Sequence, residues 1–268
     1  MKRLLIVIAV VAAVAPVAAS AGTSASTTSA RADCAKLRAT MGTTAFSHAY
    51  ATFGACVSRY APIEQQVNTS ANATCTAQQA DPNFAAAHGG QTFTQFYGVG
   101  KKEHDAFARC LSTVARANRL AEQQGRLNPA RTCRALRSQL TASVFNQTYG
   151  KNANDRNAFG KCVSATARAQ AHNEVSASIA CRTDQSDPNF ASSHGGKTFE
   201  QTYGTNADRS NAFGMCVSST ARAASTAQMN ATVQAALACK AEKKSDPTAF
   251  KAKYRTFARC VALTRSSS

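Results

Sequence analysis

Apolar residues of this 268-residue chain follow two different patterns, and the first is a continuous apolar run from Leu4 to Ala19 behind a basic N-terminus. Small residues at 19–21 then form a cleavage site of the kind that ends a secretory signal peptide. The run of about 16 residues is shorter than the roughly 20 that span a bilayer. We therefore predict a signal peptide at 1–21, rather than a membrane anchor, and a secreted or extracytoplasmic protein.

The second pattern begins after residues 22–33, which are rich in Ser, Thr and Ala, lack apolar periodicity and predict a flexible linker. From residue 34, a Cys is followed by Phe-x-x-x-Tyr and then by Phe-x-x-Cys, five times over. All ten Cys, ten of the 13 Phe and five of the six Tyr fall in this frame. We predict one Cys-repeat domain over 34–268, with units at 34–56, 75–110, 133–162, 181–216 and 239–260.

The chain also repeats with a second, longer period. Three pairs of equivalent cysteines are each 106 residues apart: Cys75 and Cys181, Cys110 and Cys216, and Cys133 and Cys239. The second and fourth units also share an insert that begins with Asp-Pro-Asn-Phe and ends with His-Gly-Gly, at 81–90 and 187–196. The first and fifth units lack the loop between Tyr and the second Phe, as expected of repeats that cap an array.

The segments Tyr-Gly-Thr-Asn at 203–206 and Asn-Ala-Phe-Gly-Lys-Cys-Val at 157–163 carry a resemblance. The chain is similar to uncharacterised bacterial secreted Cys-repeat proteins with these motifs. The resemblance covers all five units, loosely in the first and last, and implies no activity.

The spacing of the aromatic residues predicts helices. Phe and Tyr at i and i+4 share one helix face, and Gly98, Gly150 and Gly204 directly follow the Tyr, where a left-handed cap would end the helix. An Asp or Asn suited to an N-cap then precedes the next Ala-Phe, at Asp105, Asn157 and Asn211. The sequence shows no sustained alternation typical of strands.

The Ala-rich stretches that follow predict long helices. Residues 163–182 and 217–244 contain no Gly or Pro, so we expect each to be one continuous helix. Pro62 and the Gly125–Pro129 region are expected to break the equivalent helices. The predicted fold is all-α, a disulfide-stapled helical repeat array of long Ala-rich helices joined by short Phe/Tyr helices. The sequence leaves open whether these helices fold back as hairpins or run in an extended chain.

A signal peptide with an even number of cysteines indicates disulfides. Cys162 and Cys181 lie 19 residues apart in one predicted helix, about 28 Å, far beyond the roughly 7 Å that a disulfide spans. Pairing within units is the simple solution. It gives Cys34–Cys56, Cys75–Cys110, Cys133–Cys162, Cys181–Cys216 and Cys239–Cys260.

Composition limits the size of the core. Only 33 of the 247 residues from Gly22 onward are Leu, Ile, Val or Phe, and the net charge is +17 for the whole chain and +15 for this part. Such a chain is unlike a large single-core enzyme and favours small stapled units.

Several cations recur in the register of the cysteines, and a regular array would place them in a row along its surface. We predict polyanion binding by this row: cell-wall polymers or lipid headgroups, with nucleic acid a weaker candidate. The alternative is that the cations only keep exposed helices soluble. The candidates are Arg109, Arg116, Arg134, Lys161, Arg168, Arg182, Arg222, Lys240 and Arg259.

Catalytic patterns are weak. The His-Gly-Gly segments resemble an esterase oxyanion strip, but no Gly-x-Ser-x-Gly accompanies them, so we interpret them as turns. The Asn-rich loops at 152–157 and 206–211 carry too few carboxylates for calcium and are interpreted as turns. We predict no catalytic residue, metal or cofactor. The prediction is a non-enzymatic extracellular or envelope binding module; the alternatives are a structural spacer and, less favoured, a secreted hydrolase.

Overall fold

The computed structural model describes residues 20–98, 103–150 and 156–266, and every regular element within them is a helix. The predicted all-α, disulfide-stapled fold class is confirmed. The predicted signal peptide falls almost entirely outside the described residues and stays a prediction. No helix in the described ranges combines the length and apolar character needed to cross a membrane.

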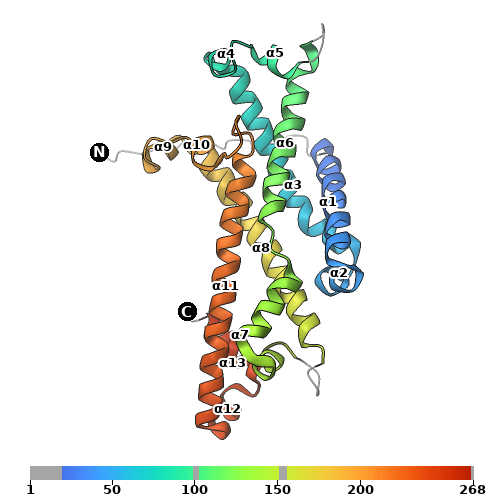
Figure 1. The fold of residues 1–268 in the computed structure, drawn as a ribbon, viewed down its shortest axis with the longest axis vertical. Helices are drawn as coiled ribbons and strands as arrows, with labels where there is room; N and C mark the ends of the chain where they lie inside the picture. The colour runs from blue at the N-terminus through green and yellow to red at the C-terminus, as the bar shows by residue number, and fades with distance from the viewer. Residues whose placement is uncertain (1–19, 99–102, 151–155, 267–268) are drawn as a thin grey trace, which may run out of the picture.

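Long helices run back and forth along the molecule (Figure 1). Successive long helices are antiparallel, because a disulfide joins a point near the end of one to the start of the next. The sequence left hairpins and an extended array open, and the structure shows hairpins. The long helices are α3 (Phe53–Ala80), α6 (Ala106–Gly125) followed by α7 (Pro129–Tyr149), α8 (Ala158–Ser186) and α11 (Ala212–Ser245).

Short helices carry the Phe-x-x-x-Tyr pairs. They are α2 (Thr43–Tyr50), α5 (Phe93–Tyr97), α10 (Phe199–Tyr203), α12 (Pro247–Tyr254) and the part of α7 that follows a kink at Thr141. The inserts add α4 (Phe84–Ala87) and α9 (Phe190–Ser193). The remaining elements are α1 (Ser20–Met41), α13 (Phe257–Ser266) and the 3-10 turn η1 (Glu103–Asp105).

All five disulfides form within units, as predicted. Their Cα–Cα distances are 5.9–6.0 Å, and all ten half-cystines are buried. Each bond fastens a long helix to the segment beyond the Phe/Tyr-bearing helix. The bonds therefore hold the aromatic side chains against the helix ends.

The apolar core consists of two clusters, one formed by the odd-numbered units and one by the even-numbered units. Apolar side chains of the first, third and fifth units form one cluster, here called the odd-unit core. Those of the second and fourth units form a second cluster, the even-unit core. In Figure 1, α4, α5, α9 and α10 lie toward one end of the molecule and α12 and α13 lie at the other. Antiparallel helices explain this division, since each turn of the chain brings alternate units back to the same end.

Residues 22–33 are not a flexible linker, and that prediction is wrong. They belong to α1, which packs along α3 and buries Ser26, Ala30 and Asp33. Because the segment contains no Pro and only one Gly, its backbone can join the helix that carries Cys34.

Pro62 does not break its helix, which also corrects the prediction. α3 continues through it, although an interior proline costs an isolated helix about 3 kcal/mol. Tyr60, Ile63 and Val67 are buried on either side of the proline. Tertiary packing therefore outweighs the lost backbone hydrogen bond. The expected break between Gly125 and Pro129 does occur.

Gly98, Gly150 and Gly204 end their helices, but in extended rather than left-handed backbone. At Gly204 the reason is space, because an added Cβ would lie 2.5 Å from the Arg209 Cβ and 2.6 Å from the Glu200 carbonyl oxygen. Asp105, Asn157 and Asn211 do occupy N-cap positions, yet none makes a side-chain capping hydrogen bond.

Glycine also allows α6 and α11 to cross closely. A Cβ on Gly214 would lie 2.0 Å from the Asn118 carbonyl oxygen, and one on Gly125 would lie 2.1 Å from the Ser218 Cβ. The Gly214 amide donates to Asn118 Oδ1 at 3.0 Å within this crossing. The contact joins the second and fourth units at backbone distance.

Candidate functional site

The nine cations predicted to bind polyanions lie mostly on the surface. Eight are exposed and Arg182 is half-buried, with its Nη1 donating to Gln185 Oε1 at 2.6 Å. Arg109 forms an ion pair with Asp105. The Arg222 guanidinium lies 3.4 Å from the Gly125 carbonyl oxygen.

Because alternate units meet at opposite ends, the candidates divide with the cores to which their neighbouring cysteines belong. One group accompanies the even-unit core: Arg109, Arg116, Arg182 and Arg222. The other accompanies the odd-unit core: Arg134, Lys161, Arg168, Lys240 and Arg259. The molecule therefore presents two basic regions.

The odd-unit end contains a groove lined with lysine. Lys240, Lys243 and Lys244 occupy i, i+3 and i+4 positions near the end of α11 and therefore share one face. They face α7 across a space of about 360 Å³, with Phe257 of α13 at its wall. We call this the lysine groove; its other lining residues are Thr141, Ser143, Val144 and Gln147.

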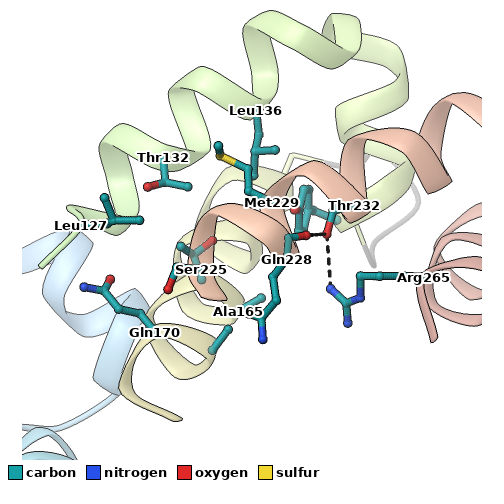
Figure 2. Close-up of a pocket in the computed structure, with 13 residues that line it drawn as sticks. Leu127, Thr132, Leu136, Ala165, Gln170, Ser225, Gln228, Met229, Thr232 and Arg265 are labelled. Carbon is teal, nitrogen blue, oxygen red and sulfur yellow. Dashed lines mark hydrogen bonds between the residues drawn. The ribbon is translucent and has the colours of Figure 1, made fainter. Parts of the chain in front are cut away.

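A second concavity is enclosed by α7, α8, α11 and α13 (Figure 2). It has a volume of about 80 Å³, and Thr132, Gln170, Ser225 and Thr232 supply much of its polar lining. Arg265 reaches in from α13, and its Nη1 donates to Thr232 Oγ1 at 3.4 Å. The lining contains no His, Cys, Lys or carboxylate; its titratable groups are Arg265 and Tyr149, whose pKa burial raises, and the space suits water or a small polar molecule.

A third pocket lies beneath α1. Its volume is about 280 Å³, and Leu37, Met41, Leu127 and Pro129 give it an apolar lining beside the break between α6 and α7. Two residues that line this pocket are joined by a hydrogen bond, in which Lys36 Nζ donates to Gln123 Oε1 at 2.8 Å.

Beside this pocket, a charge cluster joins four helices in the interior. Its members are Asp33 of α1, Glu64 of α3, Arg119, Glu122 and Arg126 at α6, and Glu174 of α8. Four carboxylates accompany two guanidinium groups, and all four acidic residues are buried.

Arg126 is the centre of the cluster. Its Nε and Nη2 donate to the two oxygens of Glu122 at 2.8 and 2.7 Å. Its Nη1 lies 3.2 Å from Asp33 Oδ2, its Nε lies 3.4 Å from Glu174 Oε2, and its guanidinium sits 4.1 Å from the Tyr60 ring centroid. A guanidinium has five N–H donors in one plane, so it can serve several acceptors at once.

Burial raises the pKa values of three of these carboxyls, those of Glu64, Glu122 and Glu174. Burial raises the pKa of Glu122 well above its ordinary range and also raises that of Glu174, against the opposing attraction of Arg126. Burial, reinforced by Asp33, raises the pKa of Glu64 to about 7 although Arg119 Nε donates to it at 2.7 Å.

Sequence reasoning missed this cluster, although a signal existed. Glu122 and Glu174 each stand 12 residues after the second Cys of their unit, and Asn118 and Gln170 each stand eight residues after it. These positions are polar and buried in otherwise Ala-rich helices. Recurrence at a fixed distance from the cysteines, as for the cations, was the signal that could have found it.

The two His-Gly-Gly segments are turns, as interpreted. His88 stacks on Phe84 with ring centroids 3.8 Å apart, and its Nδ1 lies 2.8 Å from the Phe84 carbonyl oxygen. His194 repeats this arrangement on Phe190. The following glycines have positive φ, between 64° and 84°. Both histidine rings therefore make these contacts within their own turn.

The loop at 206–211 is held by its own side chains. Asn211 Oδ1 accepts from the Thr205 amide at 3.0 Å, and Ser210 donates to Asp208 Oδ1 at 2.8 Å. The matching loop at 152–157 falls mostly outside the described residues. Within the described ranges, no group of three or more His, Cys, Asp or Glu is placed to hold a metal ion.

Comparisons with known proteins found no matching family model, no matching curated protein and no matching solved structure.

Proposed function

We infer that this protein is a non-enzymatic, secreted or envelope-associated module that binds anionic polymers or surfaces. One observation carries the proposal: the fold buries several acidic side chains and leaves the recurring basic side chains exposed. The charge cluster buries four of the chain's 14 acidic residues together with one arginine, Arg126, whereas eight of the nine register-matched cations are exposed. Withdrawing acids from the surface leaves the exposed side chains more basic than the net charge alone indicates.

The five disulfides support the location, because such bonds persist in oxidising compartments outside the cytoplasm. A rigid, stapled array of basic side chains binds an anionic polymer by displacing its counterions. The affinity then falls as salt rises.

The test is binding of the oxidised chain from residue 22 to heparin, polyphosphate and anionic vesicles across a salt series. We expect affinity that declines linearly with the logarithm of salt concentration. Two triple variants probe the two basic regions: Arg109, Arg116 and Arg222 to Gln, and Arg134, Lys161 and Arg168 to Gln.

Each triple variant should weaken binding and flatten the salt dependence. Absence of binding to all three probes at low salt would overturn the proposal and favour the alternative, a spacer whose charge only maintains solubility. Binding that is unchanged in both variants would also contradict it.

A further inference from the structure

The lysine groove differs from the other basic positions in that several cations converge on one concave surface. Lys240, Lys243 and Lys244 face it together, and no acidic residue lines it. Like charges at i and i+4 repel along a helix, so their convergence carries a cost that an anion would relieve. The helix dipole at the end of α11 offsets part of that cost.

One of the three lysines is held in place. Lys243 Nζ donates to Gln147 Oε1 at 2.8 Å and lies 5.9 Å from the Phe257 ring centroid. Within the described part of the chain, Lys240 and Lys244 have no hydrogen-bond or ion-pair partner. Two ammonium groups are therefore available to a ligand beside a third that is already oriented.

The backbone opposite the lysines is strained. Thr141 has φ 60° and ψ 154°, a conformation that a β-branched residue rarely adopts. Gly42 has nearly the same angles, φ 79° and ψ 155°, at the equivalent place four residues before the Phe of the first unit. The third unit thus has a threonine side chain where a glycine would be unstrained, and that side chain lines the groove.

Building on the proposed function, we propose that the lysine groove binds a phosphate ester group of the anionic partner. Three ammonium groups act as point charges with freely rotating donors, which suits a multiply charged tetrahedral anion. Thr141 and Ser143 place two side-chain hydroxyls in the same lining. Carboxylates prefer the planar fork of arginine, and no arginine lines this groove.

The first experiment measures inorganic pyrophosphate binding by calorimetry at fixed ionic strength, with citrate as a carboxylate probe of similar charge. The test variant replaces Lys240, Lys243 and Lys244 with Gln. The matched control replaces Arg38, Arg131 and Arg137 with Gln, which removes the same charge from exposed positions of α1 and α7 outside the groove.

We expect the lysine variant to lose roughly tenfold or more in pyrophosphate affinity, the control to lose much less, and citrate to bind more weakly than pyrophosphate. Equal losses of pyrophosphate affinity in the two variants would overturn the proposal that the groove binds phosphate. The proposed function would then still stand. Heparin binding without pyrophosphate binding would do the same. No binding to any anion would overturn both. Thermal melts verify folding, and a Lys240 and Lys244 double variant keeps the Lys243 contacts intact.

Thr141→Gly separates a ligand role from a structural one. Because glycine adopts this backbone without strain, the melting temperature should rise, whereas loss of the hydroxyl should weaken pyrophosphate binding severalfold. A variant that is more stable and binds equally well would count against the proposal. Polyphosphate and vesicles containing phosphatidic acid then distinguish a soluble polymer from a lipid headgroup as the source of the phosphate.

Discussion

Ala51 and Arg255 occupy the same strained turn at the two short units. Their φ angles are 62° and 64°, and in each turn the next amide donates to the carbonyl of the preceding Tyr, at 2.8 and 2.7 Å. This is a γ-turn with positive φ at its centre, a rare and strained conformation. The glycines that follow Tyr in the other three units do not relieve such a turn, because their backbone is extended.

Ala51→Gly should therefore stabilise the protein by roughly 1 kcal/mol, because glycine adopts positive φ without the Cβ clash. The measurement is the free energy of unfolding in urea. As a control, Ala223→Gly at an exposed position of α11 should destabilise by about 1 kcal/mol, as expected inside a helix. Destabilisation by both substitutions would contradict the strain at Ala51.

Glu64 makes stability depend on pH in an unusual direction. Its folded pKa is about 7, raised from 4.5. Between these values the folded protein keeps a proton that the unfolded chain has lost, so the free energy of unfolding falls as pH rises, by about 1.4 kcal/mol per pH unit for one group. The contribution is fully present below pH 4.5 and is lost as pH rises through 7. Glu122 and Glu174 act in the same direction.

We expect urea unfolding at constant ionic strength to show greater stability at pH 5 than at pH 8. Glu64→Gln should flatten that difference, whereas Glu200→Gln, outside the charge cluster, should leave it unchanged. A protein that becomes more stable from pH 5 to pH 8, with and without Glu64, would disprove the role assigned to this carboxyl.

At the scale of elements, local sequence signals predicted the long helices and misjudged their boundaries. α8 and α11 extend over the Gly- and Pro-free stretches as expected, because helix propensity and the core agree there. Pro62 and residues 22–33 were misjudged because tertiary contacts decide them: α3 and α1 are helical where each packs against the other. Helix propensity contains no information about which helix packs against which.

The close crossing of α6 and α11 depends on Gly125 and Gly214, and a substitution at Gly214 tests it. Gly214→Ala would place a Cβ 2.0 Å from the Asn118 carbonyl oxygen, so the helices must separate and the hydrogen bond from Gly214 to Asn118 must lengthen. We expect a loss of roughly 2–3 kcal/mol in the free energy of unfolding. Gly54→Ala in α3 is the matched control, because its Cβ would meet nothing closer than 3.9 Å; it should be neutral or stabilising. Equal effects would rule out the close crossing.

At the scale of the whole molecule, the sequence predicted which cysteines pair but not which units meet. Spacing along a helix excludes Cys162–Cys181, and that argument needs no tertiary structure. The sharing of cores by alternate units follows only from the antiparallel course of the long helices, which the sequence left open. The same folding distributes the candidate cations between the two cores and brings Asp33, Arg126 and Glu174 together from three helices. Long-range pairings of this kind leave little trace in local patterns.

Reduction of the disulfides should abolish cooperative folding. The bonds close loops of 21 to 35 residues, and each contributes roughly 3–4 kcal/mol in the chain-entropy account. Five such contributions exceed the roughly 5–15 kcal/mol by which domains are stable, and this chain has few large apolar side chains to compensate. Circular dichroism melts with and without strong reductant test this expectation. The reduced chain should lose its sharp transition and keep only residual Ala-rich helix, and an unchanged cooperative melt would mean that the two small cores suffice without the staples.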